Sequence, residues 1–124
     1  MTGRSRPGVT RRADGVLEKR TPHFDLALAK RSVSLHRERC FTYTARLGLT
    51  EMGLTSEEAI DAILEIDADT CFYKSMTSFN DVDLWQDVYH VQTTAGVAYV
   101  KLQTALPPKG THATPKVVIQ FKAK

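Results

Sequence analysis

The sequence of 124 residues lacks the features of a secreted, membrane-spanning or disulfide-bonded protein. Its two cysteines, Cys40 and Cys71, are too few for a disulfide framework and belong to no CxxC pair, so we expect reduced thiols and a cytoplasmic location. No stretch approaches the roughly eighteen apolar residues of a transmembrane helix, so no membrane association is expected. The Arg-rich amino terminus has no apolar run behind it, and we therefore expect no secretory signal.

The motifs of several large enzyme classes are absent as well. The sequence has no Gly-rich phosphate loop, no HExxH pair, no nucleophile elbow and no cluster of Cys and His ligands. These absences argue against phosphate-loop, metalloprotease and α/β-hydrolase chemistry, and we expect neither a metal nor another cofactor. The histidines are scattered, and only His90 lies among polar and aromatic residues of a candidate strand.

The net charge of +3 is unevenly distributed along the chain. Residues 1–20 carry a net +4 and residues 21–39 a net +2, whereas residues 40–87 carry −8. Residues 88–124 contain five lysines and no acidic residue. Basic ends around an acidic middle favour a polyanionic partner for one face, although solvated charged faces are common. Since residues 21–124 alone sum to −1, such an attraction has to be local.

The length suits one ordinary domain, and 42% hydrophobic residues are enough for a modest core. Residues 1–16 combine Gly, Pro, Arg and Thr and have almost nothing to bury, so we expect a disordered basic arm. This arm either contacts a nucleic acid or has no role. Residues 17–124 are then expected to form a single folded domain.

Three helices are predicted before residue 70. The first covers residues 21–37 and opens with a threonine N-cap followed by proline. The second covers Tyr43–Met52, where Gly53 supplies a left-handed stop. The third opens at a capping box formed by Thr55 and Glu58.

After the helices the pattern changes to one of strands. Four segments are rich in aromatic and β-branched residues and are bounded by polar or proline-containing turns. The expected strands are Cys71–Phe79, Leu84–Thr93, Val97–Leu106 and Lys116–Lys122. A proline-containing loop separates the last two. Helices first and consecutive strands after predict an α+β fold, with the helices packed on a mainly antiparallel sheet.

Polar side chains are embedded in these strands. They are Lys74, Gln86, Tyr99, Lys101 and Lys122, and in the third strand they alternate with apolar neighbours. Lysine neutralises a phosphate, glutamine donates and accepts hydrogen bonds, and tyrosine stacks on a base or transfers a proton, so such a face suits RNA. An antiparallel sheet with one solvated face carries the same residue types. The pattern alone therefore leaves both interpretations open.

Three blocks of sequence resemble the MqsR family of toxins from bacterial type II toxin–antitoxin systems, whose fold is RelE-like. The blocks are Glu18–His23 (EKRTPH), Phe72–Thr77 (FYKSMT) together with Trp85–Tyr89 (WQDVY), and Phe121–Lys124 (FKAK). Their order and approximate spacing are those of the family. The similarity covers residues 17–124 and is weakest through residues 34–70.

The resemblance implies an mRNA interferase, a metal-independent endoribonuclease that cleaves messenger RNA and stops translation and growth until an antitoxin binds it. Carried over by motif, the catalytic residues are Lys74, Gln86, Tyr99 and Lys122. Further candidates for substrate binding are Met76, His90 and Lys101. Most of these are the polar positions that the strand pattern singles out independently.

The chemistry of RNA cleavage fits these residue types. RNA carries its own nucleophile, the 2′-hydroxyl, so the protein has to orient it, move protons and stabilise the charge that develops on the phosphate. We expect Lys74 and Lys122 to bind the scissile phosphate, Tyr99 to handle a proton or a base, and Gln86 to orient the backbone. Because lysine and tyrosine have reference pKa values near 10, proton transfer at pH 7 requires a shift, and the identity of the base stays open.

Three features depart from the family pattern. His90 follows WQDVY where the family often has arginine, and the loop over residues 106–115 is longer than expected. Family members tend to begin near the EKRTPH block, so the arm is the third departure. Leu17 stands where an initiator methionine is expected, and we hypothesise that translation begins there from a non-AUG codon.

Two alternatives to an enzyme stay open at this point. One is a catalytically inactive RNA-binding module on the same fold, and the other is a protein-interaction module that works through the acidic segment or an exposed strand edge. The partner that the resemblance implies is an antitoxin, in which a zinc-binding module is fused to a helix-turn-helix DNA-binding domain. Zinc and operator DNA would then belong to the partner.

Overall fold

The computed structural model describes residues 8–105 and 116–124. The described helices and strands, in chain order, are β1 (Val9–Arg11), β2 (Leu17–Lys19), α1 (Leu26–His36), the 3-10 turn η1 (Arg37–Cys40), α2 (Tyr43–Met52), α3 (Ser56–Leu64), α4 (Ala68–Cys71), β3 (Phe72–Thr77), β4 (Trp85–Thr93), β5 (Gly96–Ala105) and β6 (Lys116–Ala123). Residues 1–7 of the expected arm and the proline-containing loop over residues 106–115 lie outside the described residues.

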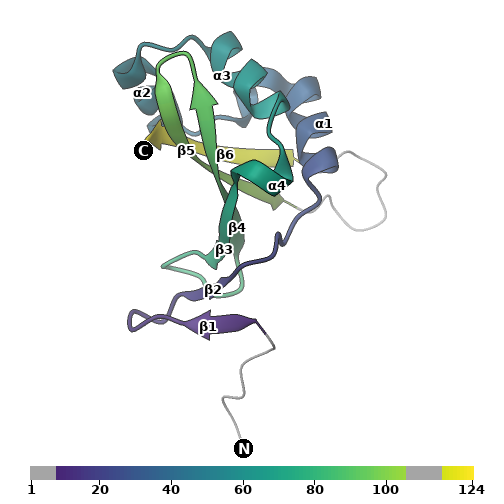
Figure 1. Cartoon of the computed structure of the whole chain (residues 1–124), viewed down its shortest axis with the longest axis vertical. Coiled ribbons are helices and arrows are strands. Elements are labelled where there is room, and N and C mark those ends of the chain that lie inside the picture. Colours follow the sequence, from purple (N-terminus) through teal and green to yellow (C-terminus); the bar gives the residue numbers. More distant parts are fainter. Residues whose placement is uncertain (1–7, 106–115) are drawn as a thin grey trace, which may run out of the picture.

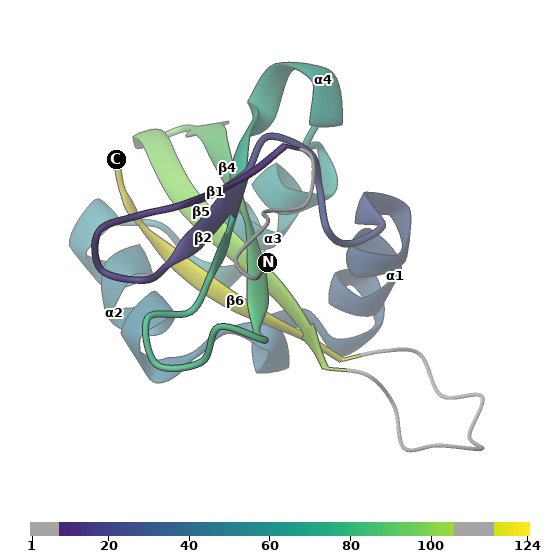
Figure 2. The ribbon, with the colours of Figure 1, turned by 90° about the horizontal axis from the view of Figure 1, so that it is seen from below.

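The six described strands form one antiparallel sheet in the order of the sequence, β1-β2-β3-β4-β5-β6. The three longest strands, β4, β5 and β6, form one half of the sheet with β6 at its edge, and α1, α2 and α3 gather at the end of the molecule away from β1 (Figure 1). Viewed from below, α1 and α2 lie on opposite flanks of β6 (Figure 2). The predicted α+β class is confirmed, with helices packed on an antiparallel sheet.

The core lies between the helices and one face of the sheet. Strands β4, β5 and β6 contribute alternate residues to it, as the pleat of a strand requires, and the helices contribute their apolar faces. Its sheet residues include Tyr89, Val91, Ala98, Val100, Leu102, Val117, Ile119 and Phe121, and its helix residues include Ala29, Val33, Ala45, Leu49, Ala59, Ile60 and Ile63. In β5 the apolar residues that alternate with Tyr99 and Lys101, namely Ala98, Val100 and Leu102, belong to this core.

Helix α2 packs unusually close to β6. A Cβ added at Gly48 would lie 2.1 Å from the carbonyl oxygen of Phe121, so only glycine permits this approach. The backbone N–H of Thr42, the N-cap of α2, donates to the carbonyl of Ile119 at 3.2 Å. The start and the middle of the helix are therefore both fixed against the last strand.

Two predicted helix signals are confirmed in atomic detail. Gly53 ends α2 with φ 72°, the left-handed conformation that glycine adopts without strain. Thr55 accepts from the Glu58 backbone N–H at 3.1 Å while the Glu58 carboxylate accepts from the Thr55 backbone N–H at 2.9 Å. This reciprocal pair is the capping box that opens α3.

The predicted start of the first helix is wrong. Asp25, not Thr21, is the N-cap of α1, and its side chain accepts from the backbone N–H groups of Ala27 and Leu28. The residues before it are not helical, and the Asp87 carboxylate accepts from the backbone N–H groups of His23 and Phe24 at 2.9–3.0 Å. A tertiary contact thus overrides the local helix signal.

The described part of the expected arm differs from the expectation of disorder. Residues 9–11 pair with residues 17–19 as a β-ribbon, and β2 in turn pairs with β3. Val16 is 2% exposed, and the Leu17 N–H donates to the Thr77 hydroxyl at 2.9 Å. Backbone pairing and one buried valine therefore order a segment whose composition is typical of a loop. The predicted strand over residues 71–79 also begins one residue later than expected, because Cys71 is the last residue of the short helix α4.

No helix within residues 8–105 and 116–124 is long and apolar enough to cross a membrane.

Candidate functional site

The face of the sheet opposite the helices carries all the predicted site residues. Residues directly opposite one another in a sheet point to the same side, and the register pairs Lys74 with Val88 and Val88 with Lys101. It likewise pairs His90 with Tyr99 and Tyr99 with Lys122, and Met76 with Gln86. We call this surface the lysine face, defined by Lys74, Met76, Gln86, His90, Tyr99, Lys101 and Lys122. The seven residues come from four strands, β3 to β6.

Val88 shows how closely the lysine face is packed. It is 0% exposed, yet it lies on this face and does not belong to the helix-side core. In the register it lies between the two lysines at positions 74 and 101. The neighbouring side chains therefore shield it, as the aliphatic stems of lysines commonly do while their ammonium groups stay at the surface.

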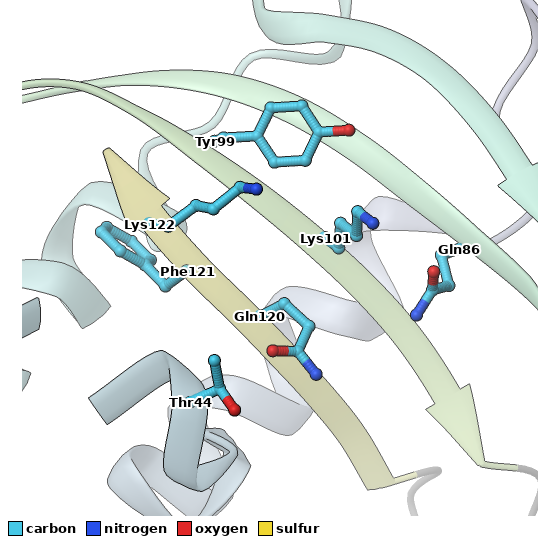
Figure 3. Close-up of a pocket in the computed structure, with 7 residues that line it drawn as sticks. All are labelled: Thr44, Gln86, Tyr99, Lys101, Gln120, Phe121 and Lys122. Atoms are coloured by element: carbon cyan, nitrogen blue, oxygen red, sulfur yellow. The ribbon is translucent and has the colours of Figure 1, made fainter. Parts of the chain in front are cut away.

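A pocket of about 230 Å³ opens on the lysine face (Figure 3). Its lining residues are Thr44, Gln86, Tyr99, Lys101, Gln120, Phe121 and Lys122. Three of the four predicted catalytic residues are among them, and Thr44 brings the start of α2 to its rim. Lys74, Met76 and His90 share the face but do not line the pocket.

The Tyr99 ring lies near two lysine ammonium groups. Lys122 Nζ is 5.4 Å and Lys101 Nζ 5.7 Å from the ring centroid, distances at which a cation is attracted to an aromatic face. Burial raises the pKa of the Tyr99 hydroxyl, with the positive charge of Lys74 opposing the rise. Tyr99 therefore keeps its proton at neutral pH and acts as a hydrogen-bond donor.

The pKa of Lys101 shifts in the opposite direction to that of Tyr99. Burial lowers its pKa, and the positive charges of Lys122, Lys74 and Arg12 lower it further. Each of these effects disfavours the charged form of an amine. A larger fraction of neutral amine is therefore present at Lys101 than at a solvated lysine.

Lys74 has a carboxylate partner that sequence reasoning missed. Lys74 Nζ lies 2.5 Å from Glu18 Oε2, and Arg12 approaches the same oxygen at 3.5 Å. The hydrogen bond from Lys74 is the main cause that lowers the pKa of Glu18. The only sequence signal was the position of Glu18 at the head of the EKRTPH block, because its pairing depends on a strand that the sequence did not predict.

His90 lies in a stack of rings beside the pocket. Its imidazole is 4.4 Å from the Tyr73 ring with 25° between the planes, and 5.8 Å from the Tyr99 ring. Burial, together with the charge of Lys124, lowers the pKa of His90, so the ring is neutral at pH 7. Tyr73, which sequence reasoning did not single out, thus joins the aromatic part of the lysine face.

Gln86 is held by a neighbouring side chain on the same face. Its Nε2 donates to Gln103 Oε1 at 3.2 Å, which fixes the amide at the edge of the pocket. The next residue, Asp87, points to the other face and is 1% exposed. Its hydrogen bonds to the backbone before α1 explain why WQDVY and EKRTPH occur together: the two blocks contact each other.

The comparisons with known proteins identify the family. The family described as "Motility quorum-sensing regulator, toxin of MqsA" matches residues 21–123. The chain is 37% identical over 86 residues to the mRNA interferase toxin MqsR of Escherichia coli (strain K12), covering 69% of this chain and 86% of that protein. The chain belongs to the MqsR toxin family. The resemblance on the three sequence blocks is confirmed.

Membership of the MqsR family agrees with the kind of site on the lysine face. Within the described ranges, 8–105 and 116–124, no group of three or more His, Cys, Asp or Glu side chains is arranged to hold a metal ion. The polar groups that do converge there are lysines, amides and a tyrosine. An MqsR-family toxin with these residues has groups for binding a phosphate and for moving protons.

Proposed function

We propose that the chain is an mRNA interferase toxin that cleaves messenger RNA on the lysine face and thereby stops translation and growth. One observation carries the proposal: Gln86, Tyr99 and Lys122, together with Lys101, line one pocket on an open face of the sheet. Lys74 lies on the same face, one strand beyond β4. Membership of the MqsR toxin family and the name of the Escherichia coli relative support the same activity.

The reaction begins with the 2′-hydroxyl of the RNA. Its oxygen attacks the adjacent phosphorus, the bond to the 5′-oxygen breaks, and the products are a 2′,3′-cyclic phosphate and a 5′-hydroxyl. The ammonium groups of Lys74 and Lys122 bind the phosphate and stabilise the charge that develops on it. Gln86 orients the RNA backbone by hydrogen bonds, and Tyr99, which stays protonated, donates to the phosphate or stacks on a base.

The aromatic side chains beside the pocket suit single-stranded RNA. Unpaired bases stack on aromatic rings, and the stack of Tyr73 with His90 lies on the same face as the pocket. Met76 adds an apolar surface next to Gln86 in the cross-strand register. Bases would therefore contact these side chains of β3 and β4, next to the lysines that bind the phosphate.

The partner of the toxin is an antitoxin, as the family description "toxin of MqsA" indicates. We propose further that this antitoxin is a zinc-binding protein with a helix-turn-helix DNA-binding domain, and that the toxin acts in the cytoplasm, where its mRNA substrate is found. Isolation of the complex with the neighbouring gene product, followed by a zinc assay and operator binding, tests the first of these statements.

Cleavage itself is tested by primer extension on RNA from cells that make the wild-type chain or Lys74→Ala. We expect new 5′-hydroxyl ends with the wild type and a loss of about 100-fold or more with Lys74→Ala, because a preorganised charge at the phosphate is removed. Arg31→Ala, an exposed change on α1, is the matched control and retains cleavage. Full cleavage by Lys74→Ala or Tyr99→Phe would contradict the assignment.

The same experiment separates the enzyme from an inactive module on the same fold. An RNA-binding module would retain RNA and produce no new ends. A protein-interaction module would show the same phenotype with and without the changes on the lysine face. The convergence of lysine, glutamine and tyrosine in one pocket favours the enzyme.

A further inference from the structure

Lys101 occupies the centre of the lysine face. It lies on β5, with Val88 of β4 on one side and Gln120 of β6 on the other. Its side chain is half-buried and lines the pocket together with Gln86, Tyr99 and Lys122 (Figure 3). The predicted catalytic lysine Lys74, by contrast, does not line this pocket.

Among the described residues, the charged groups that shift the pKa of Lys101 are positive. The titratable groups that face it are Lys122 from β6, Lys74 from β3 and, farther away, Arg12, with Tyr99 on its own strand. Within the described residues, no carboxylate lies within the 4.0 Å of an ion pair with Lys101. Lys74 differs, because Glu18 compensates its charge. Burial and these neighbours lower the pKa of Lys101.

We propose that Lys101 is a further catalytic residue, the group that takes the proton from the 2′-hydroxyl of the RNA. This inference rests on the proposed function. The neutral amine of Lys101 accepts the proton while the 2′-oxygen bonds to phosphorus, and the ammonium of Lys122 gives a proton to the 5′-oxygen as its bond to phosphorus breaks. One proton is taken and one is given, and exchange with water restores both lysines.

The other groups near the pocket are less suited to accept this proton. Tyr99 has a raised pKa and keeps its own proton. His90 does not line the pocket, and its ring is stacked against Tyr73. The Glu18 carboxylate is engaged by Lys74 and Arg12 on the far side of β3 from the pocket. Of the two amines that line the pocket, Lys101 is half-buried beside other positive charges, whereas Lys122 is exposed.

The test compares Lys101→Met and Lys101→Arg with the wild type on a short RNA that contains one cleavage site, under single-turnover conditions from pH 5.5 to 9.5. Lys101→Met keeps an unbranched side chain without the amine, and Lys101→Arg keeps the positive charge but does not deprotonate in this range. We expect both variants to lose about 100-fold or more in rate, as removal of a general base does. The wild-type rate should rise with pH and then level off, whereas the rate of the arginine variant should not show this rise.

A role in phosphate binding alone predicts a different result. Lys101→Arg would then retain most of the activity, or restore what Lys101→Met loses, and this outcome would overturn the inference. Thermal unfolding of each variant shows whether it is folded. If Lys101→Met does not fold, the rate of Lys101→Arg alone tests the role of Lys101. If the wild type cleaves no RNA at all, the proposed function fails; if the wild type and both variants cleave equally, only the role of Lys101 fails.

Discussion

At the scale of single residues, the pair of Glu18 and Lys74 gives the amino-terminal ribbon a connection to the lysine face. Both side chains are mostly buried, 16% and 13% exposed, so water screens the pair less than it screens a pair at the surface. Glu18 lies opposite Met76 in the register, and strand β2 therefore sets its position. The ion pair holds the Lys74 side chain on the face where RNA is expected to bind.

The pair predicts a pH dependence of stability. The pKa of Glu18 is lower in the folded protein than the reference 4.5, so the carboxylate stabilises the fold above that value, and this contribution is lost as pH falls through the folded-state pKa. We expect the difference in urea midpoint between wild type and Glu18→Gln to be largest at pH 6–7 and to shrink below about pH 4.5. Parallel midpoint curves for the two proteins from pH 3 to 7 would contradict this role.

At the scale of helices and strands, local signals in the sequence predicted the elements whose caps are local. Gly53 and the pair Thr55 and Glu58 act within one turn of their own helix, so sequence spacing was sufficient to find them. The start of α1 was missed because the carboxylate of Asp87, more than sixty residues away, binds the backbone N–H groups of His23 and Phe24 outside the helix. Such a contact has no signature in the local sequence.

The strands show the same division between local and tertiary causes. Alternation of apolar and polar residues predicted β5 and the face on which Tyr99 and Lys101 lie, because side chains in a strand alternate. The ribbon of β1 and β2 was missed because its short strands depend on pairing with β3 rather than on composition. Because β2 was not predicted, the ion pair of Glu18 with Lys74 was not predicted either. Motif resemblance supplied the prediction of which residues are catalytic, which alternation alone left open.

Gly48 provides a test of how helix packing supports the site. In Gly48→Ala the new methyl group would overlap the Phe121 carbonyl, so α2 or β6 has to move. We expect a loss of roughly 3 kcal/mol in the free energy of unfolding, at the upper end for overpacking. The reason is that the overlapping atom belongs to the backbone. Urea denaturation of the wild type and Gly48→Ala measures this loss of stability.

Glu51→Ala, at an exposed position of the same helix, is the control for Gly48→Ala and should change stability by less than about 0.5 kcal/mol. Because Phe121 precedes Lys122 on β6, the folded fraction of Gly48→Ala should also bind RNA less well. Wild-type stability in Gly48→Ala would show that the helix and the strand separate at little cost.

At the scale of the whole molecule, the uneven charge of the sequence becomes a difference between two faces. Exposed acids such as Glu51, Glu57 and Asp61 lie on α2 and α3, which cover one face of the sheet. Lys74, Lys101 and Lys122 lie on the other. Although the net charge is only +3, the sheet therefore presents lysines to RNA on the face opposite these acids.

This arrangement predicts a local salt dependence of RNA binding. Each phosphate neutralised on a single strand contributes about −0.7 to the slope of log affinity against log salt concentration. We expect Lys122→Met to make the slope shallower by about 0.7. Fluorescence anisotropy with an RNA that carries a 2′-deoxy group at the cleavage site measures binding without cleavage. Arg31→Ala on α1 should leave the slope unchanged, and an equal effect of the two changes would contradict a localised binding face.

The distribution of the site over β3, β4, β5 and β6 also governs when activity arises during synthesis. Chains are made from the amino terminus, and β6 is the last of these strands to leave the ribosome. Until β6 pairs with β5, neither Lys122 nor Gln120 is present to complete the pocket. A nascent chain therefore lacks the complete pocket while β6 is still being translated, and we expect that this chain cannot cleave the message that encodes it during that time.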